Sequence, residues 1–163
     1  MHQSEDSFRR RFDFAQAIAL RAGRILSSFY WGSFTVTYKG VTDPLTDADT
    51  TSEKAIADAI AKEFPGDVLM AEEFHNGVQP PHSSYWCVDP LDGTVNFSHR
   101  LPWFNVSIAY VVDGRPVLGV VHVPVLGVTY AARIGYGATR NGVPISVSST
   151  NALIKSLVAT GFP

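Results

Sequence analysis

The spacing of apolar residues changes once along this chain, near residue 65, and that change limits the folds open to it. Before this point apolar residues recur at steps of three and four, and after it they alternate with polar residues. Steps of three and four line one face of a helix, whereas alternation lines one face of a strand. Long helices followed by consecutive hairpins predict an α+β layered domain, not a doubly wound parallel sheet.

The predicted elements follow from this change of period. One helix is predicted over residues 5–30 and a second over residues 50–64, where Pro65-Gly66 ends it. Asp113-Gly114-Arg115-Pro116 joins the two longest strands as a hairpin. The predicted strands cover residues 68–71, 85–88, 106–112, 117–123, 126–132 and 156–160. Because the last of these ends close to the end of the chain, we expect residues 1–145 to form one domain and 146–163 to begin a second that is otherwise absent.

Composition narrows the class of protein. The chain has 163 residues, 45% of them apolar and 17% charged, which is typical of a globular domain with a real core. A net charge of -2 argues against nucleic acid or an anionic membrane as the main partner. No apolar run approaches the roughly 20 residues of a membrane helix. The single cysteine, Cys87, excludes an internal disulfide and suits a reducing cytoplasm, and its apolar neighbours predict a buried structural thiol.

The segment Asp89-Pro90-Leu91-Asp92-Gly93-Thr94 carries the strongest chemical signal. It places two carboxylates three residues apart, and Mg²⁺ takes one or two protein carboxylates while phosphate oxygens complete its shell. Gly93 permits close backbone approach, and the amides of Gly93 and Thr94 can meet an anion if a helix begins here. The segment predicts a metal and phosphate site. Two successive Asp turns are the alternative interpretation.

Two further acidic segments lie at the ends of predicted elements. Asp43-Pro44-Leu45-Thr46-Asp47-Ala48-Asp49 precedes the second helix, where helix capping is the simpler interpretation. Its Asp47-x-Asp49 spacing does not match a calcium-binding EF-hand loop. Glu72-Glu73 follows a strand, where solvated loop charge is the simpler interpretation. Three such segments can converge on a metal, but periodicity alone does not decide it.

Taken in order, these segments resemble the inositol monophosphatase family of Mg²⁺-dependent, lithium-sensitive phosphatases. The resemblance covers the chain from near residue 8 to its end. Its most specific element is the Asp-Pro-Leu-Asp-Gly-Thr segment. The matching residues are Trp86-Cys87-Val88-Asp89-Pro90-Leu91-Asp92-Gly93-Thr94-Val95-Asn96-Phe97, His99, Pro102-Trp103-Phe104, Lys39, Thr46-Asp47-Ala48-Asp49, Glu72-Glu73 and Ala159-Thr160-Gly161-Phe162-Pro163.

The resemblance implies a layered sugar-phosphatase-like fold and a role for each matching site residue. Glu72, Asp89 and the Leu91 carbonyl would hold one Mg²⁺, and Asp89 would bridge to a second that Asp92 also holds. The amides of Gly93 and Thr94 would bind the substrate phosphate. Asp49 would accept a hydrogen bond from the Thr94 hydroxyl, and with Glu72 these two form the implied catalytic set. A homodimer acting on a small phosphorylated metabolite, with inositol monophosphate favoured, is also implied.

The chain departs from the family pattern at its end. Family members continue through the rest of a second sheet and a Trp-Asp segment that completes the second metal site, and this sequence contains no Trp-Asp. We therefore expect a truncated second sheet domain and weak or absent turnover. Histidinol phosphate, fructose 1,6-bisphosphate and nucleotide-derived phosphates stay open as substrates. A non-catalytic metal-binding or interaction fragment, pairing through an open sheet edge, is the alternative function.

Overall fold

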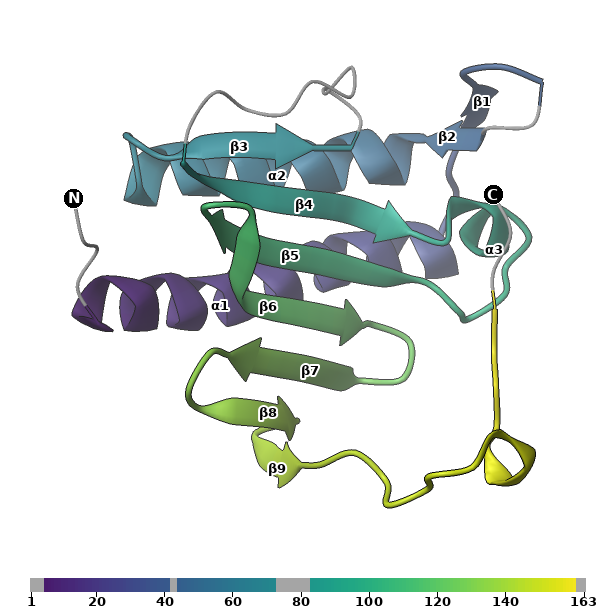
Figure 1. Cartoon of the computed structure of the whole chain (residues 1–163). Coiled ribbons are helices and arrows are strands. Elements are labelled where there is room, and N and C mark those ends of the chain that lie inside the picture. The colour runs from purple at the N-terminus through teal and green to yellow at the C-terminus, as the bar shows by residue number, and fades with distance from the viewer. Residues whose placement is uncertain (1–4, 42–43, 73–82, 161–163) are drawn as a thin grey trace.

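A computed structural model describes residues 5–41, 44–72 and 83–160. Two long helices lie on one face of a seven-stranded sheet, and a short third helix follows the end of strand β4 (Figure 1). A separate two-stranded sheet, β1 (Val36–Tyr38) with β2 (Pro44–Thr46), precedes the second helix and has no counterpart among the predicted strands. The predicted α+β layered class is confirmed.

Helix α1 (Glu5–Trp31) matches its prediction, and helix α2 (Asp47–Glu63) begins three residues earlier than predicted. The earlier start has a local cause. The Thr46 side chain accepts from the Asp49 amide while the Asp49 side chain accepts from the Thr46 amide, a reciprocal capping box that fixes the first turn. Within the described residues, neither helix is long and apolar enough to cross a membrane.

The large sheet has the order β3-β4-β5-β6-β7-β8-β9. All its neighbouring strands are antiparallel except β3 and β4, which are parallel, so the predicted antiparallel sheet contains one parallel pair. The strands are β3 (Val68–Ala71), β4 (Ser84–Asp92), β5 (Asn105–Val112), β6 (Arg115–Val123), β7 (Val128–Arg133), β8 (Gly137–Arg140) and β9 (Val143–Ile145).

The face of the sheet beneath the helices, called here the covered face, holds the core. Helix α2 packs on β3 and β4, and helix α1 packs mainly on β5 and β6. Trp86, Ile108 and Val120 point into this layer and are almost completely buried, as are Leu26 and Ile56 from the helices. Burying one such side chain stabilises a fold by about 1.5–3 kcal/mol, so this layer is the main source of stability.

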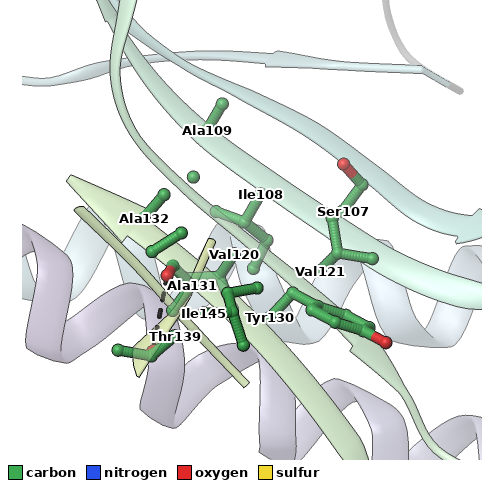
Figure 2. A pocket seen from close by; sticks show the side chains of 12 residues that line it. Ser107, Ile108, Ala109, Val120, Val121, Tyr130, Ala131, Ala132, Thr139 and Ile145 are labelled. Atoms are coloured by element: carbon green, nitrogen blue, oxygen red, sulfur yellow. Dashed lines mark hydrogen bonds between the residues drawn. The ribbon is translucent and has the colours of Figure 1, made fainter. Parts of the chain in front are cut away.

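The opposite face, called here the bare face, carries no helix among the described residues (Figure 1). Cross-strand pairing aligns small residues along it, and Figure 2 shows the shallow hollow that they help to line. The aligned row is Cys87, Ala109, Gly119, Ala132 and Ala138 and ends at the larger Ile145; all of these except Cys87 line the hollow. Cys87 is therefore only half-buried, and the prediction of a buried thiol was wrong because this strand position points to the uncovered side.

Residues 146–160, which follow β9, form no strand. Residues 146–160 contain only a short 3₁₀ turn, Leu153–Lys155, and the side chain of Leu157 is fully exposed. The predicted strand over 156–160 was wrong, because its apolar composition meets no neighbouring strand to extend the sheet. The chain instead runs from β9 toward the end of the molecule that carries α3 (Figure 1). The proposed division at residue 145 stays a prediction.

Candidate metal and phosphate site

Strand β4 ends in a bulge that contains three of the four predicted ligands, Asp89, Leu91 and Asp92. Asp89 pairs with Ser107 and Asp92 pairs with Asn105, so Pro90 and Leu91 have no partners in the ladder. Side-chain hydroxyls approach their backbone carbonyls instead. The Ser52 hydroxyl donates to the Pro90 carbonyl at 3.2 Å, and the Thr94 hydroxyl lies 3.0 Å from the Leu91 carbonyl. The alternative interpretation of two successive Asp turns was therefore wrong, because residues 89–92 continue strand β4 to an irregular end.

Parallel pairing brings Glu72 beside Asp89. Ala71 is in register with Val88, and the Glu72 amide donates to the Val88 carbonyl at 3.1 Å. Burial raises the pKa of Asp89 to about 8, and the charge of Glu72, a hydrogen bond with its carboxyl and the charge of Asp92 add to the rise. The Leu91 amide, 3.1 Å from Asp89 Oδ1, opposes it. Such crowded carboxyls favour a shared proton or a bound cation.

Asp49 links helix α2 to the residues after β4. Its carboxylate is 1% exposed, and Oδ2 accepts from the Thr46 amide at 2.8 Å and the Thr46 hydroxyl at 2.5 Å. Its other oxygen, Oδ1, lies 3.2 Å from the Thr94 hydroxyl. Helix capping and contact with the site were posed as alternatives for this residue. Asp49 does both, one with each oxygen.

Gly93 makes the connection between β4 and helix α3 (Thr94–Ser98). Its φ is +90°, in the left-handed region, and a Cβ here would lie 2.8 Å from the Trp103 carbonyl oxygen. Glycine is therefore required by both backbone conformation and space. Among the residues that the structure describes, no side chain caps the start of α3. The backbone amides at this start have the character of an anion-binding turn, although the helix has only five residues.

The donor chemistry of these residues fits Mg²⁺, which prefers carboxylate and carbonyl oxygens. Asp92 is exposed, and its Oδ2 accepts a hydrogen bond from the side-chain amide of Asn105 at 2.7 Å. In residues 5–41, 44–72 and 83–160, however, no group of three or more His, Cys, Asp or Glu side chains is already arranged to hold a metal. The predicted ligand set therefore stays a prediction. Asp43 and Glu73 lie outside the described residues.

Two residues of this site were missed from the sequence, Ser52 and Asn105. Ser52 is fully buried and lies three positions after Asp49, on the same face of α2. That spacing was a usable signal, because residues three apart share a helix face. Asn105 gave no comparable signal. Its pairing with Asp92 depends on the bulge, which shifts the register of the two strands.

Comparison with known proteins supports the resemblance. A model of the inositol monophosphatase family matches residues 9–163. A fructose-1,6-bisphosphatase/inositol-1-monophosphatase of Thermotoga maritima is 39% identical over 153 residues, covering 93% of this chain and 58% of that protein. A histidinol-phosphatase of Chlorobaculum parvum is 39% identical over 136 residues, covering 83% and 52%.

The fold agrees with these sequence matches. The solved structure of a Thermotoga maritima IMPase superposes with a TM-score of 0.78 at 41% identity, covering 86% of this chain and 54% of that one. The chain thus spans a little over half the length of the relatives it matches. With nearly all of its own length matched in sequence and most of it in structure, this chain belongs to the inositol monophosphatase family.

Proposed function

We propose that this chain carries the metal and phosphate part of a Mg²⁺-dependent phosphomonoester hydrolase, with inositol monophosphate as the favoured substrate. The observation that carries the proposal is the contact between Thr94 and Asp49, 3.2 Å apart, beside the bulge that contains Asp89. A hydroxyl backed by a buried carboxylate, next to a pair of crowded carboxyls, suits hydrolysis by water. Membership of the family supports the reaction class.

Glu72, Asp89 and the Leu91 carbonyl are assigned to one metal, and Asp89 with Asp92 to a second. When bound, Mg²⁺ would supply an activated water and neutralise charge on the phosphate oxygens. The crowding that raises the pKa of Asp89 supports this assignment, since a divalent cation offsets the repulsion between Asp89, Glu72 and Asp92.

Thr94 and Asp49 are assigned to the attacking water. When the Thr94 hydroxyl donates to Asp49 Oδ1, its lone pairs are left to accept from a water, which orients the water for in-line attack. The proton can then pass from water to Thr94 Oγ1 and from Thr94 to Asp49. The amides of Gly93 and Thr94 are assigned to the phosphate, because the glycine lets an anion approach the backbone.

Phosphate release from inositol 1-phosphate, with and without Mg²⁺, tests this proposal. We expect weak Mg²⁺-dependent release by the 163-residue chain and its loss in Asp89→Asn and Thr94→Ala. Histidinol phosphate, fructose 1,6-bisphosphate and 2′-AMP are the competing substrates for the same assay. The proposal also includes inhibition by lithium, so we expect millimolar LiCl to reduce this phosphate release.

A chimera separates an incomplete site from a wrong assignment. It continues Pro163 with the second half of the Thermotoga maritima relative, which this chain does not match. We expect the chimera to turn over faster than the chain alone and to lose that activity with Asp89→Asn. A folded chimera that releases no phosphate from any of these substrates contradicts the proposed function.

A second candidate function is a non-catalytic metal-binding module that pairs with a second copy of itself. The bare face favours it, because its row of small residues contains no charge and a second copy offers the same apolar surface (Figure 2). Light scattering at several concentrations measures the assembly. Dimers that Ala138→Lys dissociates, together with Mg²⁺ binding but no hydrolysis, support this function, whereas a monomer contradicts it. We extend the first proposal to a homodimeric enzyme in the cytoplasm, which would form dimers and also release phosphate.

A further inference from the structure

We propose that Ser52 and Asn105 are positioning residues that hold the predicted metal ligands in place from two sides of the bulge. Neither residue belongs to the predicted ligand set. Ser52 comes from helix α2 and acts on the backbone of the bulge, and Asn105 comes from strand β5 and acts on the carboxylate of Asp92. The inference rests on the proposed metal site.

Ser52 supplies a hydrogen bond that the sheet does not provide. The register shift leaves Pro90 and Leu91 without partners on β5, and the Pro90 carbonyl accepts from the Ser52 hydroxyl at 3.2 Å in a fully buried place. A buried carbonyl that loses its donor is left without a hydrogen bond, which destabilises the backbone around it. Without Ser52 the bulge is expected to relax, and the next carbonyl along the chain, that of Leu91, would lose its orientation.

Asn105 acts on a ligand that is otherwise exposed. The side-chain amide of Asn105 donates to Asp92 Oδ2 at 2.7 Å, and among the described residues no other side chain donates a hydrogen bond to this carboxylate. Because the two residues are cross-strand partners, the contact follows from the sheet itself. It leaves Oδ1 of Asp92 as the oxygen for a cation and reduces the rotamer freedom that binding would otherwise remove.

The test measures Mn²⁺ binding by electron paramagnetic resonance in the 163-residue chain, without substrate. Residues that orient metal ligands typically contribute about 10–100-fold in affinity, so we expect Asn105→Ala and Ser52→Ala each to weaken Mn²⁺ binding by about 10-fold or more. Thr50→Ala is the matched control. Thr50 lies two residues before Ser52 in α2, but its hydroxyl donates to the Asp47 carbonyl at 3.2 Å and the residue is exposed.

Thermal unfolding in EDTA distinguishes positioning from a structural role. In EDTA, Asn105→Ala should unfold at the same temperature as the wild type. Mn²⁺ should raise its unfolding temperature less than it raises that of the wild type, because a metal that binds more weakly stabilises the folded state less. Ser52→Ala should lose stability in EDTA as well, and Ser52→Thr, which keeps the hydroxyl, should recover Mn²⁺ affinity. If Ser52→Ala does not fold, Asn105→Ala still decides the inference.

Three results would overturn it. Wild-type affinity in Asn105→Ala and Ser52→Ala would remove the positioning role and leave the proposed function intact. Equal weakening in Thr50→Ala would mean that the effect is not local to the bulge. A wild-type chain that binds no Mn²⁺ would remove the proposed metal site, and this inference with it.

Discussion

The two faces of the seven-stranded sheet place different constraints on the residues that form them. The covered face packs against α1 and α2, and away from the bulges its side chains alternate with those of the bare face, as buried Val120 and half-buried Val121 illustrate. The candidate site lies at the end of β4, where residues from both sides of the sheet come together. Asp49 reaches it from α2, while the strand alternation places Asp89 on the side of the bare face. A close-packed layer should tolerate little change, and an open one much more.

The largest expected effect comes from adjacent alanines on opposite faces of β7. Ala131 is 4% exposed on the covered face, and Ala132 is exposed on the bare face. Ala131→Asp buries a charge with no partner and should lower the free energy of unfolding by about 3 kcal/mol or more. Ala132→Asp should change it by less than about 0.5 kcal/mol. Urea unfolding of both variants measures the difference, and equal losses would show that the bare face is covered too.

The covered face was also the easier one to predict. Helix α1 and the strand alternation follow from local apolar spacing, and the contact between Asp49 and Thr94, 45 residues apart in sequence, was implied by the family resemblance. Local spacing does not say which side of a strand lacks a cover. Cys87 was therefore predicted buried, although it lies on the bare face.

The strand register and the extent of the sheet could not be predicted from the sequence, because local spacing does not encode them either. The bulge at Pro90 and Leu91 decides that Asn105 meets Asp92, and no local pattern encodes a register shift. Residues 156–160 have strand-like composition but form no strand, since pairing requires a neighbour that composition does not supply. Ser52 was predictable in principle from its helical spacing to Asp49.

The second prediction compares two glycines. Gly23 of α1 faces the covered side, where a Cβ would overlap His122 Cδ2 and lie 2.7 Å from His122 Nε2. Gly119 lies in the small-residue row of the bare face, where the nearest atom to a Cβ is 3.9 Å away. Replacing glycine by alanine inside a helix normally raises stability. Here, however, overpacking against His122 should make Gly23→Ala lower the free energy of unfolding by about 1–3 kcal/mol. Gly119→Ala should stay within about 0.5 kcal/mol of the wild type.

Thermal or urea unfolding measures this pair, and His122→Ala provides the internal control. Removing the imidazole should restore tolerance of Gly23→Ala, so the two changes together should cost less than their sum. If Gly23→Ala is neutral in the wild-type background, the covered face is less tightly packed at this point than the comparison requires.

The third prediction concerns pH and the site. The folded pKa of Asp89 is raised to about 8 from 3.8, so the folded chain favours the protonated carboxyl. Without metal, its contribution to stability is fully present below pH 4 and is lost as pH rises to about 8. The effect is moderated because the group is only partly buried. Urea unfolding in EDTA between pH 4 and 9 measures it.

Asp89→Asn should remove this loss in EDTA, leaving the variant more stable than wild type at pH 8. Adding Mg²⁺ at pH 8 should stabilise the wild type and not the variant, because a cation offsets the same repulsion that the proton relieves. A wild-type chain whose stability in EDTA does not fall over this range contradicts the crowding of Asp89 with Glu72.

The smallest expected effect has the opposite sign and comes from the covered face. His122 lies beneath α1, with Nδ1 2.9 Å from the Thr129 hydroxyl, and burial lowers its pKa from 6.5, with Arg24 adding to the fall and the Val128 backbone opposing it. The neutral imidazole is favoured in the folded chain. Its contribution to stability is therefore present above pH 6.5 and lost as pH falls through the lowered pKa. The loss is modest because the Thr129 hydroxyl can pair with the ring in either protonation state.

Urea unfolding of the wild type and His122→Gln between pH 5 and 7 isolates this effect, since glutamine stays neutral throughout. The wild type should lose stability on acidification relative to the variant, at the pH where His122 titrates by nuclear magnetic resonance. If the free energy of unfolding changes with pH in the same way in both proteins, a charged His122 beneath α1 does not lower the stability. The covered face would then not be the intolerant side of the sheet at this position, and the difference between the two faces would rest on Ala131 and Gly23 alone.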